Sequence, residues 1–417
     1  ALVGENMKSH QGISGKMFSA LGRNNVNVKA IAQGASERNI TAVIDSSNTK
    51  QALNILHEAF FEKHIKQINL FITGVGNVGS KLIEQLHNQS EYLKSQMKLN
   101  IKVTGLSNSR KMVTNAEGID LNSWEEQLAK GEKADPDTFF EIAKKLHLRN
   151  SIYVDNTANE DIAHTYPPYL KSSISVVTCN KIAAAETYEY YSNLKQLART
   201  YNAPYLFETN VGAGLPIIDT LNHLIASGDK VHTIQAILSG SLNFVFNEFN
   251  EKTTFREVVQ QAMDAGFTEP DPKIDLSGVD VARKILILAR ESGIKMELSD
   301  IENESFLPKA CLETEDNDSF LASLDDHNDH FEKLFTSAVS KNCRLKYVAE
   351  LVDGKAKVGL KEIPNGHDFY NLSGSDNIVL FYTDRYKDQP MIVKGAGAGG
   401  EVTASGIFAD IIRIAKQ

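Results

Sequence analysis

Short apolar runs recur between residues 68 and 207, separated by longer segments with helical spacing. The runs lie at residues 68–73, 101–106, 151–155, 174–178 and 205–207. Ile68–Thr73 is apolar at most positions, which is typical of a strand buried on both faces, and a helix is predicted at Ser80–His87. Strands that alternate with helices indicate a parallel sheet covered on both faces.

A different pattern covers residues 1–62. Strands are predicted at Leu2–Val3, Val26–Ala32 and Ile40–Asp45, and helices at Gly12–Leu21 and Thr49–Phe61. The helical residues spaced for burial are Ile13, Met17, Phe18, Leu21, Ala52, Leu53, Leu56 and Phe60. This β-α-β-β-α order is ferredoxin-like. A unit of this size has a thin core, so we expect it to pair with a second copy.

The remainder of the chain mixes helices and hairpins. Helices are predicted at residues 216–227, 254–265 and 278–292, and hairpins at Tyr347–Val352, turning at Asp353-Gly354, and at Ile378–Thr383, returning at Met391–Val393. The acidic residues 313–330 show no clear period and are predicted to form an exposed loop. A chain of 417 residues is too long for one core. We expect an α/β protein with three parts, at residues 1–64, 65–215 (rejoined by about 395–417) and 216–394.

The composition excludes several classes of function. With 42% hydrophobic and 23% charged residues the chain is typical of a globular protein. The net charge of −9, without a basic cluster, argues against nucleic acid and anionic membranes as partners. The three cysteines are widely spaced, which favours a reducing compartment over a disulfide framework or a zinc site. We therefore expect a cytoplasmic location.

The run Gly74-x-Gly76-x-x-Gly79 lies between a predicted strand and a predicted helix. Gly74 permits a tight turn, Gly76 lets the backbone approach a pyrophosphate, and Gly79 lets the helix pack on the strand. In this context we favour dinucleotide binding over a merely tight turn.

The end of the second strand bears on which dinucleotide binds. Leu106 is followed by Ser107, Arg110 and Lys111, without the acidic residue that a ribose 2′-hydroxyl requires. These three side chains are suited to a 2′-phosphate. NADP(H) is favoured over NAD(H), and the alternative is that the two cations are solvated loop residues.

Two further polar segments follow strands, at Asp155-Asn156-Thr157 and at Thr178-Cys179-Asn180-Lys181. Open parallel sheets bind ligands at the carboxyl ends of their strands. Lys181 is equally consistent with a contact to cofactor or substrate and with a solvated loop. Cys179 is not favoured as a nucleophile, because small buried cysteines are common.

The segment from Gly266 to Lys284 combines carboxylates with a lysine. Glu269, Asp271 and Asp275 lie in a proline-containing loop, and Asp280 and Lys284 share one face of the following helix. Charges at the edge of an otherwise apolar helix indicate an amino-acid substrate and proton transfer. Two structural alternatives exist: a capping box formed by Ser277-x-x-Asp280, and a helix ion pair that contributes about 0.3–0.5 kcal/mol.

Two glycine-rich bends are the remaining candidate ligand-binding segments. Glu208–Pro216 offers a carboxylate beside backbone carbonyls, oxygen ligands that suit a hard cation. A plain strand-to-helix turn is the alternative. Lys394–Thr403 precedes the last predicted helix and indicates close approach of the backbone to a ligand or a strand.

Together these segments resemble homoserine dehydrogenase over roughly residues 66–417. The matching segments are Gly74–Gly79, Thr178–Lys181, Glu208–Pro216, Leu238–Phe244, Glu269–Lys284 and Gly395–Thr403. Residues 1–62 resemble the last ACT module of an aspartokinase, notably Gly15–Phe18 and Ala32–Asn39. This order is the layout of bifunctional aspartokinase–homoserine dehydrogenases, of which the chain resembles the C-terminal part.

The resemblance implies a ferredoxin-like ACT module, a Rossmann-type domain and an α+β substrate and dimerisation domain. It implies NADPH-dependent, reversible reduction of L-aspartate 4-semialdehyde to L-homoserine. Lys284 is then the acid/base, assisted by Lys181, and Glu269, Asp275 and Asp280 either hold the ammonium group of the substrate or orient Lys284. The resemblance also implies cofactor contacts for Asn77, Val78, Thr157, Lys181 and Gly399, which join Gly74, Gly76, Gly79, Ser107, Arg110 and Lys111, predicted above from the residues themselves. It implies a Na⁺-type monovalent cation site for Glu208, Val211, Ala213 and Leu215.

The expected assembly is a homodimer or homotetramer, with an upstream aspartokinase domain as a further partner. An ACT module normally pairs with another to build an effector site, so threonine inhibition is in doubt with one module. Two other functions stay open: an amino-acid-sensing module formed by residues 1–62, and a nicotinamide dehydrogenase for another hydroxy acid.

Overall fold

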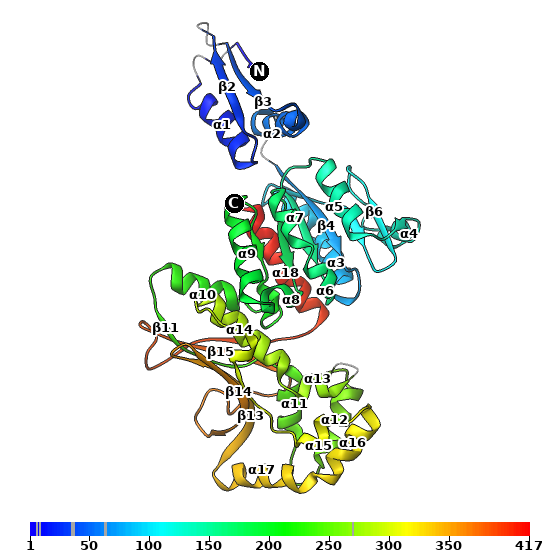
Figure 1. Cartoon of the computed structure of the whole chain (residues 1–417), viewed down its shortest axis with the longest axis vertical. Coiled ribbons are helices and arrows are strands. Elements are labelled where there is room, and N and C mark those ends of the chain that lie inside the picture. Colours follow the sequence, from blue (N-terminus) through cyan, green and yellow to red (C-terminus); the bar gives the residue numbers. More distant parts are fainter. Residues whose placement is uncertain (6, 8–9, 35–37, 62–64, 269–270) are drawn as a thin grey trace. The chain divides into compact units, whose positions relative to one another are not determined.

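The computed structural model describes residues 1–5, 7, 10–34, 38–61, 65–268 and 271–417. The chain divides into two compact units, and Figure 1 labels their helices and strands. Unit 1 comprises residues 1–180, 192–206 and 408–417, and unit 2 comprises residues 181–191 and 207–407. None of the helices among the described residues has the length and apolar character needed to cross a membrane.

The N-terminal part of unit 1 has the ferredoxin-like order. Its elements are β1 (Leu2–Val3), α1 (Ile13–Arg23), β2 (Val28–Gln33), β3 (Asn39–Ile44), the 3-10 helix η2 (Ser46–Asn48) and α2 (Thr49–Phe61). The strands form an antiparallel sheet in the order β1-β3-β2. Met17 and Leu21 on α1 pack against Val26 and Ile40 in its core, as the spacing predicts.

The buried face of α2 differs from the prediction at one position. Leu53 is 63% exposed, whereas Ala52 and Ile55 are buried. Residues at i, i+3 and i+4 share a face of a helix, so Ala52, Ile55 and Leu56 form the stripe that contacts the core. The prediction of Leu53 as a core residue is therefore wrong.

The rest of unit 1 is built around a seven-stranded sheet in the order β10-β9-β8-β4-β5-β6-β7. Its strands are β4 (Lys66–Thr73), β5 (Leu99–Ser107), β6 (Lys111–Thr114), β7 (Glu132–Lys133), β8 (Ser151–Asp155), β9 (Ser175–Thr178) and β10 (Tyr205–Leu206). The strands from β10 to β5 are parallel, and β6 and β7 add an antiparallel edge. The chain leaves β4 for β5 on one side and returns to β8 on the other, which makes the end of β4 a topological switch point.

The helices that follow these strands in the sequence are α3 (Asn77–Ser95), α4 (Trp124–Ala129), α5 (Pro136–Lys145), α6 (Glu160–Ala163), α7 (Tyr166–Lys171), α8 (Ile182–Ala185) and α9 (Tyr188–Thr200). Of these, α8 and the first residues of α9 belong to unit 2. α3 is longer at both ends than the predicted helix at Ser80–His87. It starts directly after Gly76, and Leu93 extends its buried stripe. The last helix, α18 (Gly400–Ala415), follows the glycine-rich turn as predicted.

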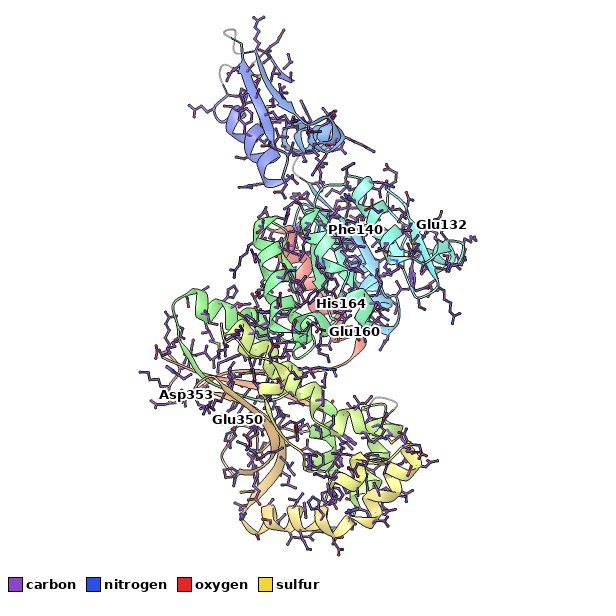
Figure 2. The ribbon with its side chains drawn as sticks, in the orientation of Figure 1. Glu132, Phe140, Glu160, His164, Glu350 and Asp353 are labelled. Carbon is purple, nitrogen blue, oxygen red and sulfur yellow. The ribbon has the colours of Figure 1, made fainter. Side chains whose placement is uncertain are left out.

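Unit 2 contains a six-stranded sheet in the order β12-β14-β13-β11-β15-β16. Its strands are β11 (Val231–Ile237), β12 (Glu302–Glu304), β13 (Cys343–Val352), β14 (Lys355–Pro364), β15 (Asp376–Thr383) and β16 (Met391–Ala396). The two predicted hairpins are β13–β14 and β15–β16. Asp353 and Gly354 both have positive φ, 47° and 81°, as a two-residue hairpin turn requires; Asp353 lies just beyond Glu350 of β13 (Figure 2).

The helices of unit 2 are α10 (Ile217–Ala226), α11 (Gly240–Glu248), α12 (Phe255–Asp264), α13 (Pro272–Leu276), α14 (Val279–Glu291), α15 (Lys309–Leu312), α16 (Asn317–Asp326) and α17 (Asn328–Ser340), with the 3-10 helices η3 (Glu208–Asn210) and η4 (Leu298–Asp300). The predicted exposed loop at 313–330 is wrong, because α16 and part of α17 occupy it. Asp316 caps α16 by accepting from the Ser319 amide, and Phe320 and Leu324 are fully buried.

A lysine without a carboxylate partner among the described residues lies inside unit 2. Lys346 on β13 is 0% exposed. Its Nζ donates to Asn243 Oδ1 (3.0 Å), Asn247 Oδ1 (2.6 Å) and Leu372 O (2.6 Å). Burial, with the nearby charge of Arg344, lowers the pKa of Lys346 to about 8. The charged form is therefore less favourable in the folded state than in the unfolded state.

This lysine makes the stability of the chain depend on pH. Below about pH 8 both states carry the proton and the penalty is complete; between about 8 and 10.5 only the unfolded state binds it, so stability rises with pH. The difference between the pKa values of Lys346 in the folded and unfolded states corresponds to about 3 kcal/mol in the free energy of unfolding. We expect Lys346→Met to remove this rise from urea-unfolding free energies measured across that range, and exposed Lys355→Met to retain it. An equal rise in wild type and Lys346→Met would contradict the assignment.

Candidate active site

A cavity of about 750 Å³ lies in unit 1 at the carboxyl ends of the parallel strands. Thr73 ends β4, Ser107 ends β5, and Thr157 follows β8; all three line the cavity. Arg110 and Phe139 are also part of its wall. The volume is in the range of small-molecule and cofactor sites, and the place is the switch point where open α/β sheets bind ligands.

The glycines of the first turn fit a dinucleotide. Gly74 has φ 89°, and a Cβ on Gly79 would lie 2.0 Å from Gly74 O, so helix α3 packs closely against the turn. Among the described residues, no atom would lie within 4 Å of a Cβ on Gly76. That open side lies at the start of α3, which begins at Asn77, and a helix N-terminus is suited to a phosphate.

The cations after β5 differ in their placement. Asn108 Oδ1 accepts from the amides of Arg110 (2.8 Å) and Lys111 (2.7 Å), which fixes the turn. Arg110 lines the cavity. The Lys111 ammonium instead donates to Gly131 O at 2.8 Å, and Lys111 is not among the residues that line the cavity. The structure thus brings Ser107 and Arg110 together and leaves Lys111 apart.

A buried carboxylate joins the ends of β8 and β9. Asp155 is 0% exposed and accepts from the Thr157 amide (2.7 Å), Tyr166 Oη (2.6 Å) and Asn180 Nδ2 (3.1 Å). Burial raises the pKa of Asp155, and these donors oppose that rise. The network holds Thr157 and the residue before Lys181 in fixed positions.

Three charged side chains meet in unit 2. The Lys284 ammonium lies 2.9 Å from Asp280 on the same helix, α14. Asp280 is also 2.6 Å from the ammonium of Lys181, which immediately precedes α8. Lys284 donates in addition to Leu238 O at 2.6 Å. Two of its three N–H donors are thus engaged among the described residues.

The electrostatics of this cluster follow from its burial. The Lys284 side chain is 12% exposed and that of Asp280 32%. Burial tends to raise the pKa of Asp280, but the charges of Lys284 and Lys181 hold it well below its usual range. Burial and the repulsion of Lys181 lower the pKa of Lys284, while Asp280 and Asp275 oppose that shift. The cluster therefore presents an ionised carboxylate beside an amine whose proton is easier to remove than that of a solvated lysine.

Asp275 lies near this cluster, on the short helix α13 rather than in a loop. Its Oδ1 accepts from Ser241 Oγ at 3.0 Å, and Ser241 contacts Ser239 Oγ at 2.9 Å. Asp271 caps α13 by accepting from the Lys273 amide. Glu269, the remaining predicted substrate ligand, falls outside the described residues.

The capping-box alternative for Asp280 is wrong. Helix α14 begins after Gly278, which has a left-handed conformation with φ 73° and, as the N-cap residue, has no side chain to cap the helix. Ser277 Oγ accepts from the Val279 amide at 3.3 Å, not from that of Asp280. A Cβ on Gly278 would lie 1.9 Å from Tyr347 Oη. The ion-pair alternative is correct in its geometry, and Asp280 has Lys181 as a second partner.

The bend at Glu208 has a structural role. Its carboxylate accepts from the amides of Ile218 (2.6 Å) and Asp219 (2.8 Å) at the start of α10. The carbonyl of Leu215 accepts from the Ile217 amide. Because both carboxylate oxygens already cap a helix, the cation site at Glu208, Val211, Ala213 and Leu215 stays a prediction, and no chemical step is assigned to a cation.

The other predicted cofactor residues occupy separate places. Asn77, Val78 and Gly79 form the first turn of α3, whereas Gly399 precedes α18 with φ 114°. The roles of the Leu238 carbonyl and of the serines at 239 and 241 were not predicted from the sequence. The run Leu238–Phe244 contains them, but its partner Lys284 is distant in the sequence, and no spacing rule connects the two.

Family models match nearly the whole chain. Residues 1–60 match the ACT domain, residues 74–208 the NAD binding domain of homoserine dehydrogenase, and residues 216–412 homoserine dehydrogenase. A hyperthermophilic archaeal homoserine dehydrogenase in complex with NADPH superposes with a TM-score of 0.65 at 25% identity, over 84% of this chain and 98% of that chain.

Two curated relatives extend the match. The bifunctional aspartokinase/homoserine dehydrogenase of Haemophilus influenzae is 41% identical over 99% of this chain and 51% of its own length, so the chain spans about half of that relative. The homoserine dehydrogenase of Schizosaccharomyces pombe is 34% identical over 84% of this chain and 96% of its own length. The chain belongs to the homoserine dehydrogenase family.

Proposed function

We propose that the chain catalyses the NADPH-dependent, reversible reduction of L-aspartate 4-semialdehyde to L-homoserine. The observation that carries this proposal is the Lys284 ammonium, which Asp280 and Leu238 O hold. Among the described residues these two contacts use two of its three donors, and the third is available for a substrate oxygen. The dinucleotide, when bound, supplies the hydride.

Lys284 acts as the general acid in the direction of reduction. As hydride reaches the aldehyde carbon, the ammonium donates a proton to the carbonyl oxygen and stabilises the developing negative charge. The amine is then neutral until it takes a proton from solvent. In the direction of oxidation the neutral amine removes the hydroxyl proton, so alkaline pH favours oxidation. Lys181 adds a second positive charge beside Asp280.

The carboxylates bind the amino-acid part of the substrate. Asp275 and Asp280 place negative charge near Lys284, which suits the ammonium group of homoserine or aspartate semialdehyde. Glu269 is proposed as a third substrate ligand on the basis of the sequence alone. Asp280 has a second task, because its charge keeps the Lys284 ammonium oriented.

The direct test is a substrate panel with the purified chain. Homoserine should reduce NADP⁺ with an increase in absorbance at 340 nm, and aspartate semialdehyde should oxidise NADPH. Lactate and malate serve as matched hydroxy acids that lack the ammonium group. Turnover of either one without turnover of homoserine would contradict the proposal.

Preference for NADP(H) is proposed to rest on Arg110 and Ser107 in the wall of the cavity. Arg110→Ala should raise KM for NADP(H) about tenfold or more, because a hydrogen bond to a charged group contributes about 1.5–3 kcal/mol, and leave KM for NAD(H) unchanged. Lys133→Ala, a nearby exposed lysine, is the control. Equal changes for both dinucleotides in Arg110→Ala would exclude a contact with the 2′-phosphate.

The proposed domains are an ACT module at residues 1–64, a dinucleotide-binding domain at 65–215 rejoined by about 395–417, and a substrate and dimerisation domain at 216–394. An aspartokinase domain is a proposed partner, because the curated relatives named as bifunctional are about twice as long as this chain. Assembly as a homodimer or homotetramer, a cytoplasmic location and effector binding at the ACT module stay predictions.

A further inference from the structure

A buried arginine ten residues beyond Asp280 occupies the other end of α14. Arg290 is 3% exposed. Its Nη1 donates to Ala184 O (2.9 Å) and Glu186 O (2.6 Å), its Nε to Met296 O (3.1 Å), and its Nη2 to Met296 O (2.9 Å). Nη2 also pairs with Glu297 at 3.0 Å. The planar fork of the guanidinium is thus used in several directions at once, which a lysine cannot reproduce.

Two of these acceptors belong to the segment that carries Lys181. Helix α8 covers only Ile182–Ala185, and Lys181 immediately precedes it. A helix this short does not hold itself together, and its last carbonyls lack partners within the helix. Arg290 supplies a donor at this end, to Ala184 O and to Glu186 O just beyond it.

Neighbouring contacts strengthen the attachment. The amide of Tyr188 donates to the Glu297 carboxylate at 3.0 Å, and Glu297 is itself paired with Arg290. Tyr191 Oη donates to Glu291, the residue after Arg290. Arg290 also lies 5.8 and 5.4 Å from the ring centroids of Tyr188 and Tyr191. The segment 181–191 therefore has one attachment to α14 at Asp280 and another around Arg290.

If Arg290 served only to form a buried ion pair, its hydrogen-bond acceptors would be mainly carboxylates. Its acceptors are mostly backbone carbonyls, and Glu297 is the one carboxylate that pairs with it among the described residues. Removal of the guanidinium would release the carbonyl end of α8 while Asp280 and Lys284 keep their places on α14.

We propose that Arg290 is a positioning residue that fixes the segment 181–191 on α14 and thereby holds the Lys181 ammonium beside Asp280. The catalytic consequence rests on the proposed function. Arg290 itself touches no reacting atom. Its effect reaches the reaction through Lys181 and the charge balance at Lys284.

This mechanism has a pH signature. In the part of the chain that the structure describes, the charged groups that act on Lys284 are Asp280 on α14, Lys181 before α8 and Asp275 on α13. If the Lys181 ammonium moves away, Lys284 is no longer repelled by a neighbouring positive charge. Asp280 then interacts with Lys284 alone. The pKa of Lys284 then rises, and the alkaline limb of homoserine oxidation moves to higher pH. Partial unfolding would lower the active fraction but would leave this limb in place.

The experiment compares Arg290→Ala and Arg290→Lys with Arg283→Ala, an exposed arginine on the same helix. We expect kcat for homoserine oxidation to fall about 10- to 100-fold in both Arg290 variants, as for a small misplacement of a catalytic group, with the alkaline limb shifted upward. Guanidinium ion at millimolar concentration should partly restore Arg290→Ala and not Arg290→Lys. Arg283→Ala should match wild type.

A second readout does not depend on turnover. Acetylation of Lys181, followed by mass spectrometry, should be faster in both Arg290 variants than in wild type, because the ammonium is no longer held by Asp280. If the wild-type chain failed to oxidise homoserine, the proposed function would fall and this labelling would still test the positioning role. Unchanged Lys181 labelling in Arg290→Lys, or a reduced kcat with an unmoved pH limb, would overturn the inference.

Discussion

We expect Lys284→Met to lower kcat for homoserine oxidation by about 1,000-fold, the middle of the range for loss of a general acid–base group. Methionine fills a similar volume, and Asp280 keeps its ion pair with Lys181, so no buried charge is left alone. KM for the dinucleotide should stay unchanged, because its proposed cavity is lined by residues of unit 1. Steady-state kinetics in both directions measure these constants.

The matched control for this prediction is Lys252→Met, which removes an exposed lysine from unit 2. It should behave as wild type. Lys284→Met should also retain the melting temperature of wild type within a few degrees. A variant that is folded and retains wild-type kcat would remove Lys284 from the mechanism.

The second large effect is expected at Gly278. Gly278→Ala places a methyl group 1.9 Å from Tyr347 Oη in a residue with φ 73°. The left-handed conformation costs about 1–2 kcal/mol, and overpacking costs about 1–3 kcal/mol more. Because α14 starts at the next residue, we expect the variant to lose both stability, by roughly 2–5 kcal/mol, and activity. Urea unfolding and homoserine oxidation are the measurements.

Gly293→Ala is the control at the other end of α14. Gly293 has φ 84°, and no described atom would lie within 4 Å of its Cβ, so only the conformational cost remains. Its free energy of unfolding should fall by about 1–2 kcal/mol, with activity retained. If both variants lost the same stability, the contact with Tyr347 would not be important for α14.

The sequence predicts much of the fold because its apolar spacing is regular. Ser151–Asp155 is a strand in both the prediction and the structure, and the Asp353-Gly354 turn is correct. The prediction that Leu53 is buried is wrong because helix α2 has apolar residues on adjacent faces. Tertiary packing buries the face that contains Ile55. The helix at Asn317–Asp326 was not predicted because acidic residues within and around it interrupt the apolar pattern, although Phe320, Leu321 and Leu324 form its buried face.

The site was predictable only where its parts are close in the sequence. Asp280 and Lys284 are one helical turn apart, so their ion pair follows from spacing. The approach of Lys181 and of Leu238 O depends on how α8 and β11 pack on α14, which no local pattern encodes. Arg290 gave no signal either, because a lone arginine near a helix end is usually a solvated residue.

The pH dependence of kcat/KM for homoserine oxidation, between about pH 6 and 11, tests the role of Lys284 most directly. Burial and Lys181 lower the pKa of Lys284 from its ordinary value of 10.5. We therefore expect kcat/KM to rise with pH and to reach a plateau, with the midpoint of the rise below pH 10.5. This pH-dependent rise should be absent in Lys284→Met. A pH-independent rate, or the same rise in the variant, would contradict the account.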